Sequence, residues 1–343
     1  MTPNIRQMIA AAICFPAVLG AQAPAQLTQF LQSSIGLDAK QLMAIERGEV
    51  VTVALDTKIG RDVAVFGIIT TRVSRDALVR QVRDFPTSLR GPNRVRFGIF
   101  GNPATLGDVQ SLTVEKNDAN DLRDCRPGDC KFKLPPSEIR RLRERVDWSA
   151  ADLPSLVTAY TRQRLVDYVT NYRAQGDSAM VEYDGPPVVR ASDAFAALLE
   201  QSPYVFDFAP SLQEYLVSYP RTTLDGGIEL TYWSEDTAPH LRKILSLTHL
   251  VLYSPPELPG TSLVAAKQIY ADHYFEAAFD LTTIVDRPDT GSYVLVVRRY
   301  RFDNLPSGGL INIRKRAVNA LRDQLGADLA RTRETAERAV AAR

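Results

Sequence analysis

The sequence is poor in the residues that most often carry chemistry. It has only three histidines and three cysteines among 343 residues. The motifs Gly-x-Ser-x-Gly, Ser-x-x-Lys and His-Glu-x-x-His do not occur, and no glycine-rich loop that cradles phosphates is present. Asp and Glu are plentiful, but nothing in the sequence pairs two of them as acid and base. The sequence therefore predicts no cofactor and no metal site, and it leaves open whether the protein is an enzyme.

The chain also lacks an excess of charge of either sign. Its 41 Lys and Arg residues balance 40 Asp and Glu residues, for a formal net charge of +1. A near-neutral chain offers little electrostatic attraction to nucleic acid or to an anionic membrane surface. The arginines between Arg140 and Arg145 are interleaved with Glu138 and Glu144, which indicates a solvated helix face. We therefore expect no nucleic-acid partner.

Long apolar runs are missing as well, apart from a short one near the N-terminus. That run extends from Met8 to Leu19, follows the single charge of Arg6, and is shorter than the roughly 20 apolar residues of a spanning helix. Small residues at 20–23 then supply a cleavage site for signal peptidase. We predict a signal peptide over 1–23, cut between 21 and 26, with an uncleaved anchor as the alternative. The remaining chain has no transmembrane segment, so a periplasmic or secreted location is expected.

Two cysteines remain after removal of the signal, which contains Cys14. Cys125 and Cys130 flank Pro127-Gly128, and these two residue types favour the central positions of a tight turn. Such a turn brings its flanking residues within reach of a disulfide, and export supplies the oxidising compartment. We predict a structural disulfide. A redox-active pair is the weaker alternative, because the usual redox motif has a two-residue spacer.

Hydrophobic periodicity predicts an alternation of strands and helices along the chain. The predicted strands are 49–55, 62–73, 93–100, 109–115, 179–183, 228–233, 244–253, 263–285 and 293–302. The predicted helices are 26–34, 74–84, 137–146, 153–175, 192–199, 211–217 and about 310–337. Residues 118–134 are expected to form a loop. The segment 263–285 is too long for one ordinary strand, so it either bends strongly or hides a turn near Ala271-Asp272.

Two parts of this pattern resemble the START/Bet v 1-like superfamily. The first is the hairpin and helix formed by Val50-Val-Thr-Val-Ala-Leu55 and the segment 62–79. The second is the antiparallel run 228–302 that ends in the long C-terminal helix. The resemblance implies an α+β helix-grip fold, in which a curved antiparallel sheet grips a long C-terminal helix over a cavity. Residues 24–343 then form an elaborated START-like domain, in which 101–225 is a large, mainly helical insertion or a subdomain.

The long helix carries an apolar stripe that should pack on the concave face of the sheet. The stripe consists of Ala317, Leu321, Leu325 and Leu329. Whether side chains or a ligand fill the space between sheet and helix is left open by the pattern.

Candidate site residues come from polar side chains on apolar strand faces. Lys267 and His273 share the parity of the apolar residues in 263–285, where a charged amine is costly without a partner or water. They either line a cavity, turn outward at a bulge, or form a buried pair within the fold. His249 shares a face with Tyr253 and is either a cavity or a core histidine. His249 and His273 together lack the carboxylate that would complete a metal site.

Aromatic residues near one loop give a further candidate. Trp233 and Tyr253, with the loop 254–260, either form the rim of a cavity or belong to a rigid connection between strands. The predicted function is an exported binding protein for an apolar or amphipathic, lipid-like molecule. The alternatives are an enzyme that uses a histidine of the same cavity as acid or base, and a ligand-free interaction module of the envelope. An apolar cavity of roughly 300 Å³ or more would favour binding.

Overall fold

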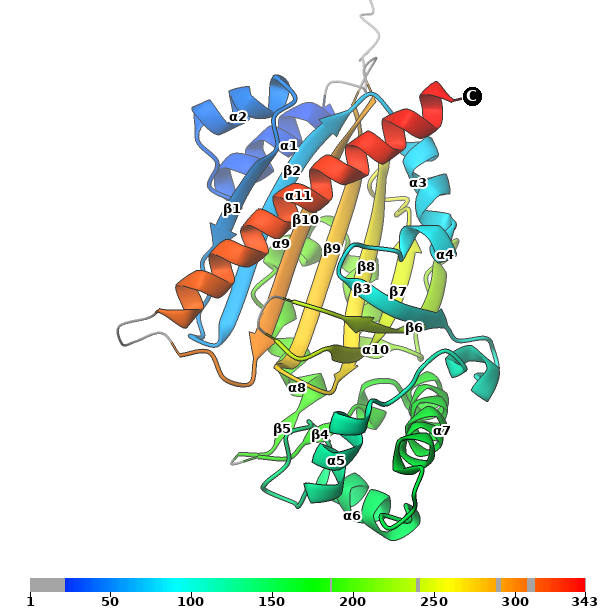
Figure 1. The fold of residues 1–343 in the computed structure, drawn as a ribbon. Coiled ribbons are helices and arrows are strands. Elements are labelled where there is room, and N and C mark those ends of the chain that lie inside the picture. The colour runs from blue at the N-terminus through cyan, green and yellow to red at the C-terminus, as the bar shows by residue number, and fades with distance from the viewer. Residues whose placement is uncertain (1–21, 186, 239–240, 288–290, 307–311, 343) are drawn as a thin grey trace, which may run out of the picture.

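The fold is built on an eight-stranded antiparallel sheet (Figure 1). The computed structural model describes residues 22–185, 187–238, 241–287, 291–306 and 312–342. In spatial order the strands are β1 (Val51–Leu55), β2 (Asp62–Thr71), β10 (Gly291–Phe302), β9 (Phe275–Arg287), β8 (Thr261–Ala271), β7 (Ile244–Tyr253), β6 (Ile228–Asp236) and β3 (Arg94–Ile99). A separate two-stranded ribbon joins β4 (Glu182–Tyr183) and β5 (Val189–Arg190).

Helices lie on both faces of the sheet and beyond one end of it (Figure 1). They are α1 (Gln22–Ser33), α2 (Ala39–Glu46), α3 (Arg75–Arg83), α4 (Phe85–Ser88), α5 (Lys116–Asp124), α6 (Pro136–Arg145), α7 (Leu153–Gln175), α8 (Ala191–Leu199), α9 (Pro203–Phe208), α10 (Pro210–Ser218) and α11 (Ile313–Ala341), with short 3₁₀ turns η2 (Leu106–Val109) and η3 (Gly176–Ala179). We call the face that carries α11 and α3 the front face, because it is nearest the viewer in Figure 1, and the opposite one the back face.

The C-terminal helix α11 crosses the front face diagonally over β1 and β2 (Figure 1). Leu325 and Leu329 of its apolar stripe are buried in a core that also contains Val65 and Ile69 of β2. Gly67 lies beneath them, and a Cβ at this position would come within 2.7 Å of Leu329 Cδ1. The missing side chain therefore lets the helix approach the sheet closely.

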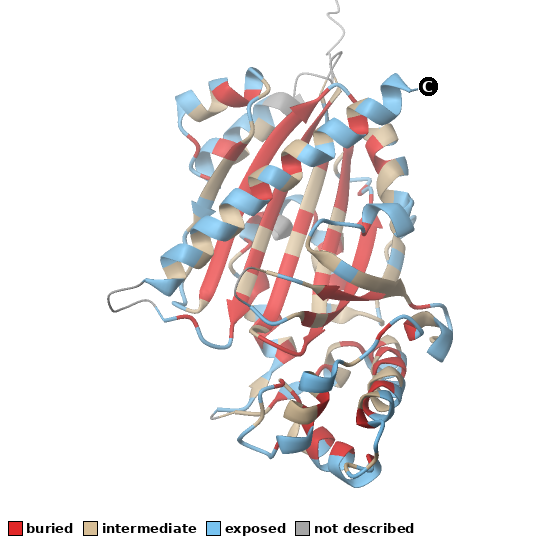
Figure 2. Ribbon diagram, in the orientation of Figure 1, coloured by how far each residue is buried: buried red, intermediate tan, exposed pale blue. Residues whose placement is uncertain are grey.

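The back face is covered by the N-terminal helices α1 and α2 and by α8, α9 and α10 of the segment 101–225. The strands contribute residues of the opposite parity to this core, among them Phe66, Ala265 and Phe279. Helices α5, α6 and α7 pack around a second core that reaches Trp233 at the end of the sheet. The segment 101–225, which separates β3 from β6, thus shares both cores with the sheet (Figure 2).

The predicted fold class is confirmed. A large antiparallel sheet, a long C-terminal helix on one face and a mainly helical insertion make a helix-grip α+β fold. The long segment 263–285 does hide a turn, because β8 ends at Ala271 and β9 begins at Phe275. Ser74 caps α3, where its hydroxyl accepts a hydrogen bond from the backbone N–H of Ala77.

Three local predictions are wrong. Residues 109–115 form no strand, because their apolar side chains Val109 and Leu112 fill the helical core instead. The predicted loop 118–134 begins with α5, which extends to Asp124. The predicted strand 179–183 is reduced to the two residues of β4, because η3 occupies its first part.

The predicted signal peptide falls almost entirely on residues 1–21, which lie outside the described residues. Within the described part of the chain, no helix is both long and apolar enough to cross a membrane.

Candidate functional site

Lys267 is buried in the back face and paired within the fold. Its Nζ donates hydrogen bonds to the carboxylate of Asp177 and, at 2.9 Å, to the backbone oxygen of Leu216. The same nitrogen lies 4.3 Å from the centre of the Phe195 ring. Burial lowers the pKa of Lys267, and the charge of Asp177 opposes that shift. Of the alternatives that the sequence left open, the geometry matches a buried pair.

His249 lies directly across from Lys267 on the neighbouring strand β7. Its Nδ1 is 3.0 Å from the hydroxyl of Tyr172, and its Nε2 is 3.0 Å from the hydroxyl of Tyr215. Tyr215 donates its own proton to Glu229, so its oxygen is left to accept from Nε2–H. A neutral His249 then accepts from Tyr172 at Nδ1. The four side chains form a one-way chain of hydrogen bonds that ends at a half-exposed carboxylate.

This chain joins three parts of the fold. Tyr172 belongs to α7, Tyr215 to α10, and His249 and Glu229 to neighbouring strands of the sheet. Burial lowers the pKa of His249, and the Glu229 carboxylate opposes that shift. The back-face polar residues therefore attach the inserted helices to the sheet.

Tyr253 and Trp233 are also buried in packed cores. Tyr253 is 4% exposed, and its hydroxyl accepts a 3.2 Å hydrogen bond from Ser211 of α10. The Trp233 side chain is fully buried and donates from Nε1 to the backbone oxygen of Asp108 at 2.9 Å. Trp233 therefore occupies the helical core, and Tyr253 the back-face core, in place of the cavity rim considered from the sequence.

His273 lies in the turn between β8 and β9, away from His249. Its Nδ1 is 2.9 Å from the carboxylate of the adjacent Asp272, and its ring packs edge-on against Phe132 at 4.6 Å. The register pairs His249 with Lys267, which is six positions before His273 along the chain. The structure thus brings Lys267 and His249 together and leaves His273 apart from both.

The disulfide between Cys125 and Cys130 is present, as predicted. Arg126 and Asp129 between them exchange two backbone hydrogen bonds of 2.9 Å, and Gly128 adopts a φ of 83°. The bond closes a short loop at the end of α5. Among the described residues, no cluster of three or more His, Cys, Asp or Glu side chains is arranged to hold a metal ion.

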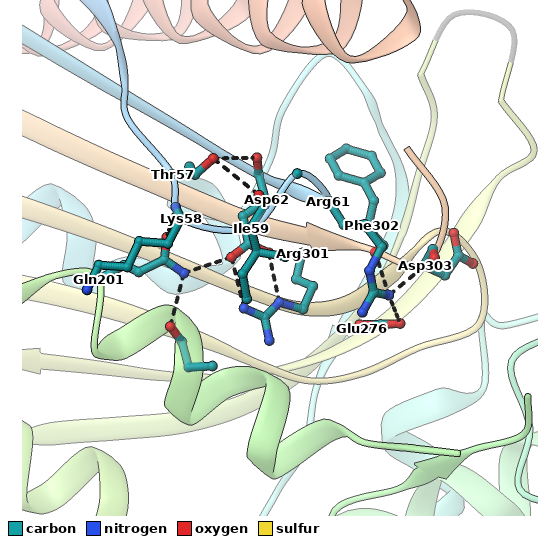
Figure 3. A network of polar contacts seen from close by, with 12 residues as sticks. Thr57, Lys58, Ile59, Arg61, Asp62, Gln201, Glu276, Arg301, Phe302 and Asp303 are labelled. Atoms are coloured by element: carbon teal, nitrogen blue, oxygen red, sulfur yellow. Dashed lines mark hydrogen bonds and ion pairs between the residues drawn. The ribbon is translucent and has the colours of Figure 1, made fainter. Parts of the chain in front are cut away.

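A polar network that the sequence analysis missed lies at one end of the sheet (Figure 3). Asp62 of β2 accepts hydrogen bonds from Arg301 of β10 and a 2.7 Å bond from Gln201, just after α8. The neighbouring Arg61 binds Glu276. Asp62 is 1% exposed and Arg301 is 7% exposed, so this network ties the inserted helices to the sheet from the inside.

The front face contains an area of buried and half-buried side chains that none of the predicted site residues reaches. We call it the front-face band, and it consists of two rows of side chains in register across the sheet. The first row is Arg298, Asp280, Ala266, Leu250 and Leu230. The second row is Tyr300 paired with Ala278, followed by Gln268 paired with Thr248 and Thr248 with Tyr232; the β8–β9 register ends one position earlier, at Lys267 and Phe279. The band lies between α11 and the edge formed by α4 and β3 (Figure 1).

Exposure differs between the two faces of β8, whereas β7 is buried on both. On β8 the back-face residues Ala265, Lys267 and Ile269 are buried, whereas Val264, Ala266 and Gln268 of the front face are half-buried. Figure 2 shows the alternation of buried and intermediate segments on the central strands. An antiparallel sheet commonly leaves one face partly solvated. Helix α11 covers β1 and β2 and leaves the middle of the front face accessible.

Polar atoms in the front-face band are incompletely paired. Asp280 Oδ1 and Gln268 Oε1 are buried, yet neither forms a hydrogen bond to any residue that the structure describes. Burial raises the pKa of Asp280, and the charge of Arg298 opposes that shift. Arg298 Nε of the same band is likewise a buried donor without a hydrogen-bond partner in the described part of the chain. Buried polar atoms are usually satisfied, so three such atoms on one face mark it as a place for further contacts.

Two hollows lie outside the front-face band. A cavity of about 60 Å³ lies where α5, α6 and α7 meet the sheet, lined by Glu138, Tyr160 and Arg164 among others. A shallow hollow of about 310 Å³ on the outer edge of β3 is lined mainly by Arg90, Arg94, Arg96 and Phe97. The first is far smaller than a typical ligand site of roughly 300 Å³ or more, and the second is not apolar.

Comparisons with known proteins give only distant likenesses. No family model matches the chain, and neither does any curated protein. The structure of Zhui aromatase/cyclase from Streptomyces sp. R1128 is 12% identical with a TM-score of 0.25, over 40% of this chain and 86% of that one. The di-domain aromatase/cyclase BexL of the BE-7585A biosynthetic pathway is 9% identical with a TM-score of 0.24, over 83% and 79%. Ara h 8.0201 is 10% identical with a TM-score of 0.18, over 41% and 87%.

At these identities and TM-scores, the likenesses say nothing about what this chain binds.

Proposed function

We propose that this chain is an exported binding protein for an amphipathic small molecule, and that the ligand lies on the front-face band beside α11. The predicted role is kept, but the proposed site moves from the back face to the front. Lys267, His249, Tyr253 and Trp233 are buried and hydrogen-bonded to the inserted segment, so they offer a ligand no open surface. His273 is also buried, in the turn between β8 and β9, although its ring nitrogens have no hydrogen-bond partner among the described residues.

The apolar half of the proposed site lies toward α4 and β3. Leu250 and Tyr232 form a small core with Leu89 of α4, against which Leu230 and Val264 are partly buried. Leu250 and Tyr232 are already buried, so the apolar surface still open here is that of Leu230 and Val264. Such surface gains roughly 25 cal/mol for each Å² that a ligand removes from water. An aliphatic or aromatic part of a ligand therefore has a favourable place along this side.

The polar half of the proposed site gives the main support for the proposal. Asp280 and Gln268 hold buried oxygen atoms without a hydrogen-bond partner among the described residues, on strands next to each other. An unsatisfied buried polar group costs about 1–3 kcal/mol, and a ligand that pairs with it recovers part of that cost. Ligand sites typically combine apolar walls with a few polar groups of this kind.

Residues 24–343 act as one elaborated domain in this proposal, with 101–225 as an insertion. Support comes from the two cores that the inserted helices share with the sheet. Export is supported by the N-terminal sequence pattern. N-terminal sequencing of the protein from a periplasmic fraction tests it, and a mature chain that begins between residues 22 and 27 is expected.

Binding of Nile red, a neutral dye that fluoresces in apolar surroundings, tests the site. The purified mature protein should enhance its fluorescence saturably. The substitution Ala266→Trp places a large side chain in the middle of the front-face band and should abolish the enhancement. Ala327→Trp, on the exposed side of α11, is the matched control and should leave it unchanged.

Thermal melting of both variants shows whether they remain folded. A lack of saturable Nile red binding by the unmutated protein would overturn the proposed function and favour the ligand-free interaction module. Equal binding by the unmutated protein and a folded Ala266→Trp variant would place the ligand elsewhere.

A further inference from the structure

Asp280 is the least compensated charged group of the front-face band. It lies in the middle of β9, opposite Ala266 on one side and Arg298 on the other. Its Oδ2 is 3.4 Å from Arg298 Nε and 3.5 Å from the hydroxyl of Tyr300, both at the long end of useful contact. Its Oδ1 has no hydrogen-bond partner among the residues described.

Arg298 gives its stronger contact to another carboxylate. Its Nη1 lies 2.9 Å from Asp328 of α11, which is 0.5 Å closer than the approach of Nε to Asp280. Asp328 also holds Arg331 at 2.5 Å through its other oxygen. Asp328 is therefore bound by two guanidinium groups, whereas Asp280 shares one of them.

The other charged pair on this face does not change the balance at Asp280. Arg94 of β3 binds Asp236 with Nε 2.9 Å from Oδ1, so its charge is already matched. The amide of Gln268 lies on β8, two residues along from Ala266, the register partner of Asp280. Arg298 and Arg331 match Asp280 and Asp328 in number, so this place is distinguished by its unpaired acceptors and not by a net charge. One carboxylate and one amide present these acceptor atoms on neighbouring strands.

We propose that Asp280 and Gln268 receive a cationic, amine-bearing head group, and that the front-face band therefore selects amine-headed amphiphiles over carboxylate-headed ones. This inference rests on the proposed function, because it names the ligand class of the same site. An ammonium group supplies three donors and a positive charge to the Asp280 carboxylate, whereas a carboxylate head has no donor for it and would bring a second negative charge beside it. The hydrocarbon part then lies along the half-buried Val264, Ala266 and Leu230.

Three ligands with the same twelve-carbon chain test the selection. Dodecylamine, dodecanol and dodecanoate differ only in the head group, and each competes with Nile red at pH 7.5 below its micelle concentration. Dodecylamine should displace the dye at a concentration about tenfold or more below that of dodecanoate, with dodecanol between them.

The substitution Asp280→Asn keeps the size of the side chain and removes its charge. It should lower the affinity for dodecylamine about tenfold relative to the affinity for uncharged dodecanol, measured on the same samples. Asp323→Asn removes a carboxylate that is 71% exposed on the same helix as Asp328, and this control should change neither value. Because the Nile red affinity is measured on the same samples, a variant that fails to fold is recognised directly.

The outcomes separate this inference from the proposed function. If the protein binds Nile red saturably but dodecanoate displaces the dye at the same concentration as dodecylamine does, the head-group selection is overturned and the binding function stands. An unchanged preference for dodecylamine in Asp280→Asn would also overturn it. No Nile red binding by the unmutated protein would overturn both.

Discussion

Arg301 holds Asp62 through two hydrogen bonds, with Nε 2.7 Å from Oδ1 and Nη2 2.8 Å from Oδ2. The two residues are register partners on β10 and β2, and both are buried. Gln201 binds the same carboxylate from the inserted segment, so three separate parts of the chain meet at one buried charge (Figure 3).

Asp62→Asn should strongly destabilise the fold. It leaves the Arg301 guanidinium buried without its counter-charge, and breaking a buried pair in this way costs about 3–5 kcal/mol. Glu49→Gln makes the same change in the pair with Arg47, whose side chains are 55% and 56% exposed, and should cost about 0–1 kcal/mol. Urea denaturation measures both. Similar losses for the two variants would show that the buried pair does not stabilise the fold.

The contact between α11 and the sheet gives a second prediction. Leu325→Ala removes a fully buried side chain and should lower the free energy of unfolding by about 2–5 kcal/mol. Gly67→Ala should also destabilise, because its new methyl group would overlap Leu329. Val340→Ala at the exposed end of α11 and Gly60→Ala, with no atom near its Cβ, are the matched controls. If Gly67→Ala melts like Gly60→Ala, the helix is not packed on β2 as closely as described.

The architecture follows from local patterns that the sequence displays. The apolar, largely β-branched run of β2 predicts a fully buried strand. The apolar residues that recur every four positions in α11 predict a helix with one apolar side. Segment 109–115 shows the limit of this reasoning. Its apolar residues Val109, Leu112 and Val114 are mixed with polar ones as in a short strand, yet they pack among helices from elsewhere in the chain.

The location of the candidate site was not predictable in the same way. Parity showed that Lys267 shares an apolar face, but it does not tell which helices cover that face. Its partner Asp177 is 90 residues away in the sequence, and no local pattern connects the two. Asp280 and Gln268 have the parity of outward-facing polar residues in a half-exposed strand, so nothing in the sequence distinguishes them from ordinary surface residues.

Lys267→Met tests the assignment of the back face as structural. The substitution leaves Asp177, which is 27% exposed, without its partner, and should cost about 1–3 kcal/mol of stability. It should not change the affinity for Nile red, because the side chain points away from the front-face band. Lys131→Met is the control. It breaks the pair between Asp121 and Lys131, whose side chain is 63% exposed, and should leave stability nearly unchanged. Weaker dye binding by a fully stable Lys267→Met variant would instead return the ligand site to the back face.

Acid should weaken the fold through His249. Burial lowers its pKa below the ordinary value of about 6.5, so below that pH the unfolded chain binds a proton that the folded chain does not. The contribution of neutral His249 to the free energy of unfolding is fully present above pH 6.5. It is lost as the pH falls from there through the pKa of His249 in the folded state. The free energy of unfolding can fall by about 1.4 kcal/mol for each pH unit in this window. Glu229 narrows the window, because it stabilises the charged imidazole and so raises the folded-state pKa of His249.

Urea denaturation at pH 7.5, 6.5 and 5.5 measures this loss. His249→Gln removes the titrating group, so its stability, although lower at pH 7.5, should fall less on acidification than that of the unmutated protein. Glu229→Gln removes the carboxylate that opposes the lowering of the His249 pKa. The stability of this variant should therefore keep falling down to a lower pH than that of the unmutated protein. Parallel pH profiles for the unmutated protein and His249→Gln would mean that His249 is not held neutral by burial. The hydrogen-bond chain from Tyr172 to Glu229 would then not depend on the protonation state of its central residue.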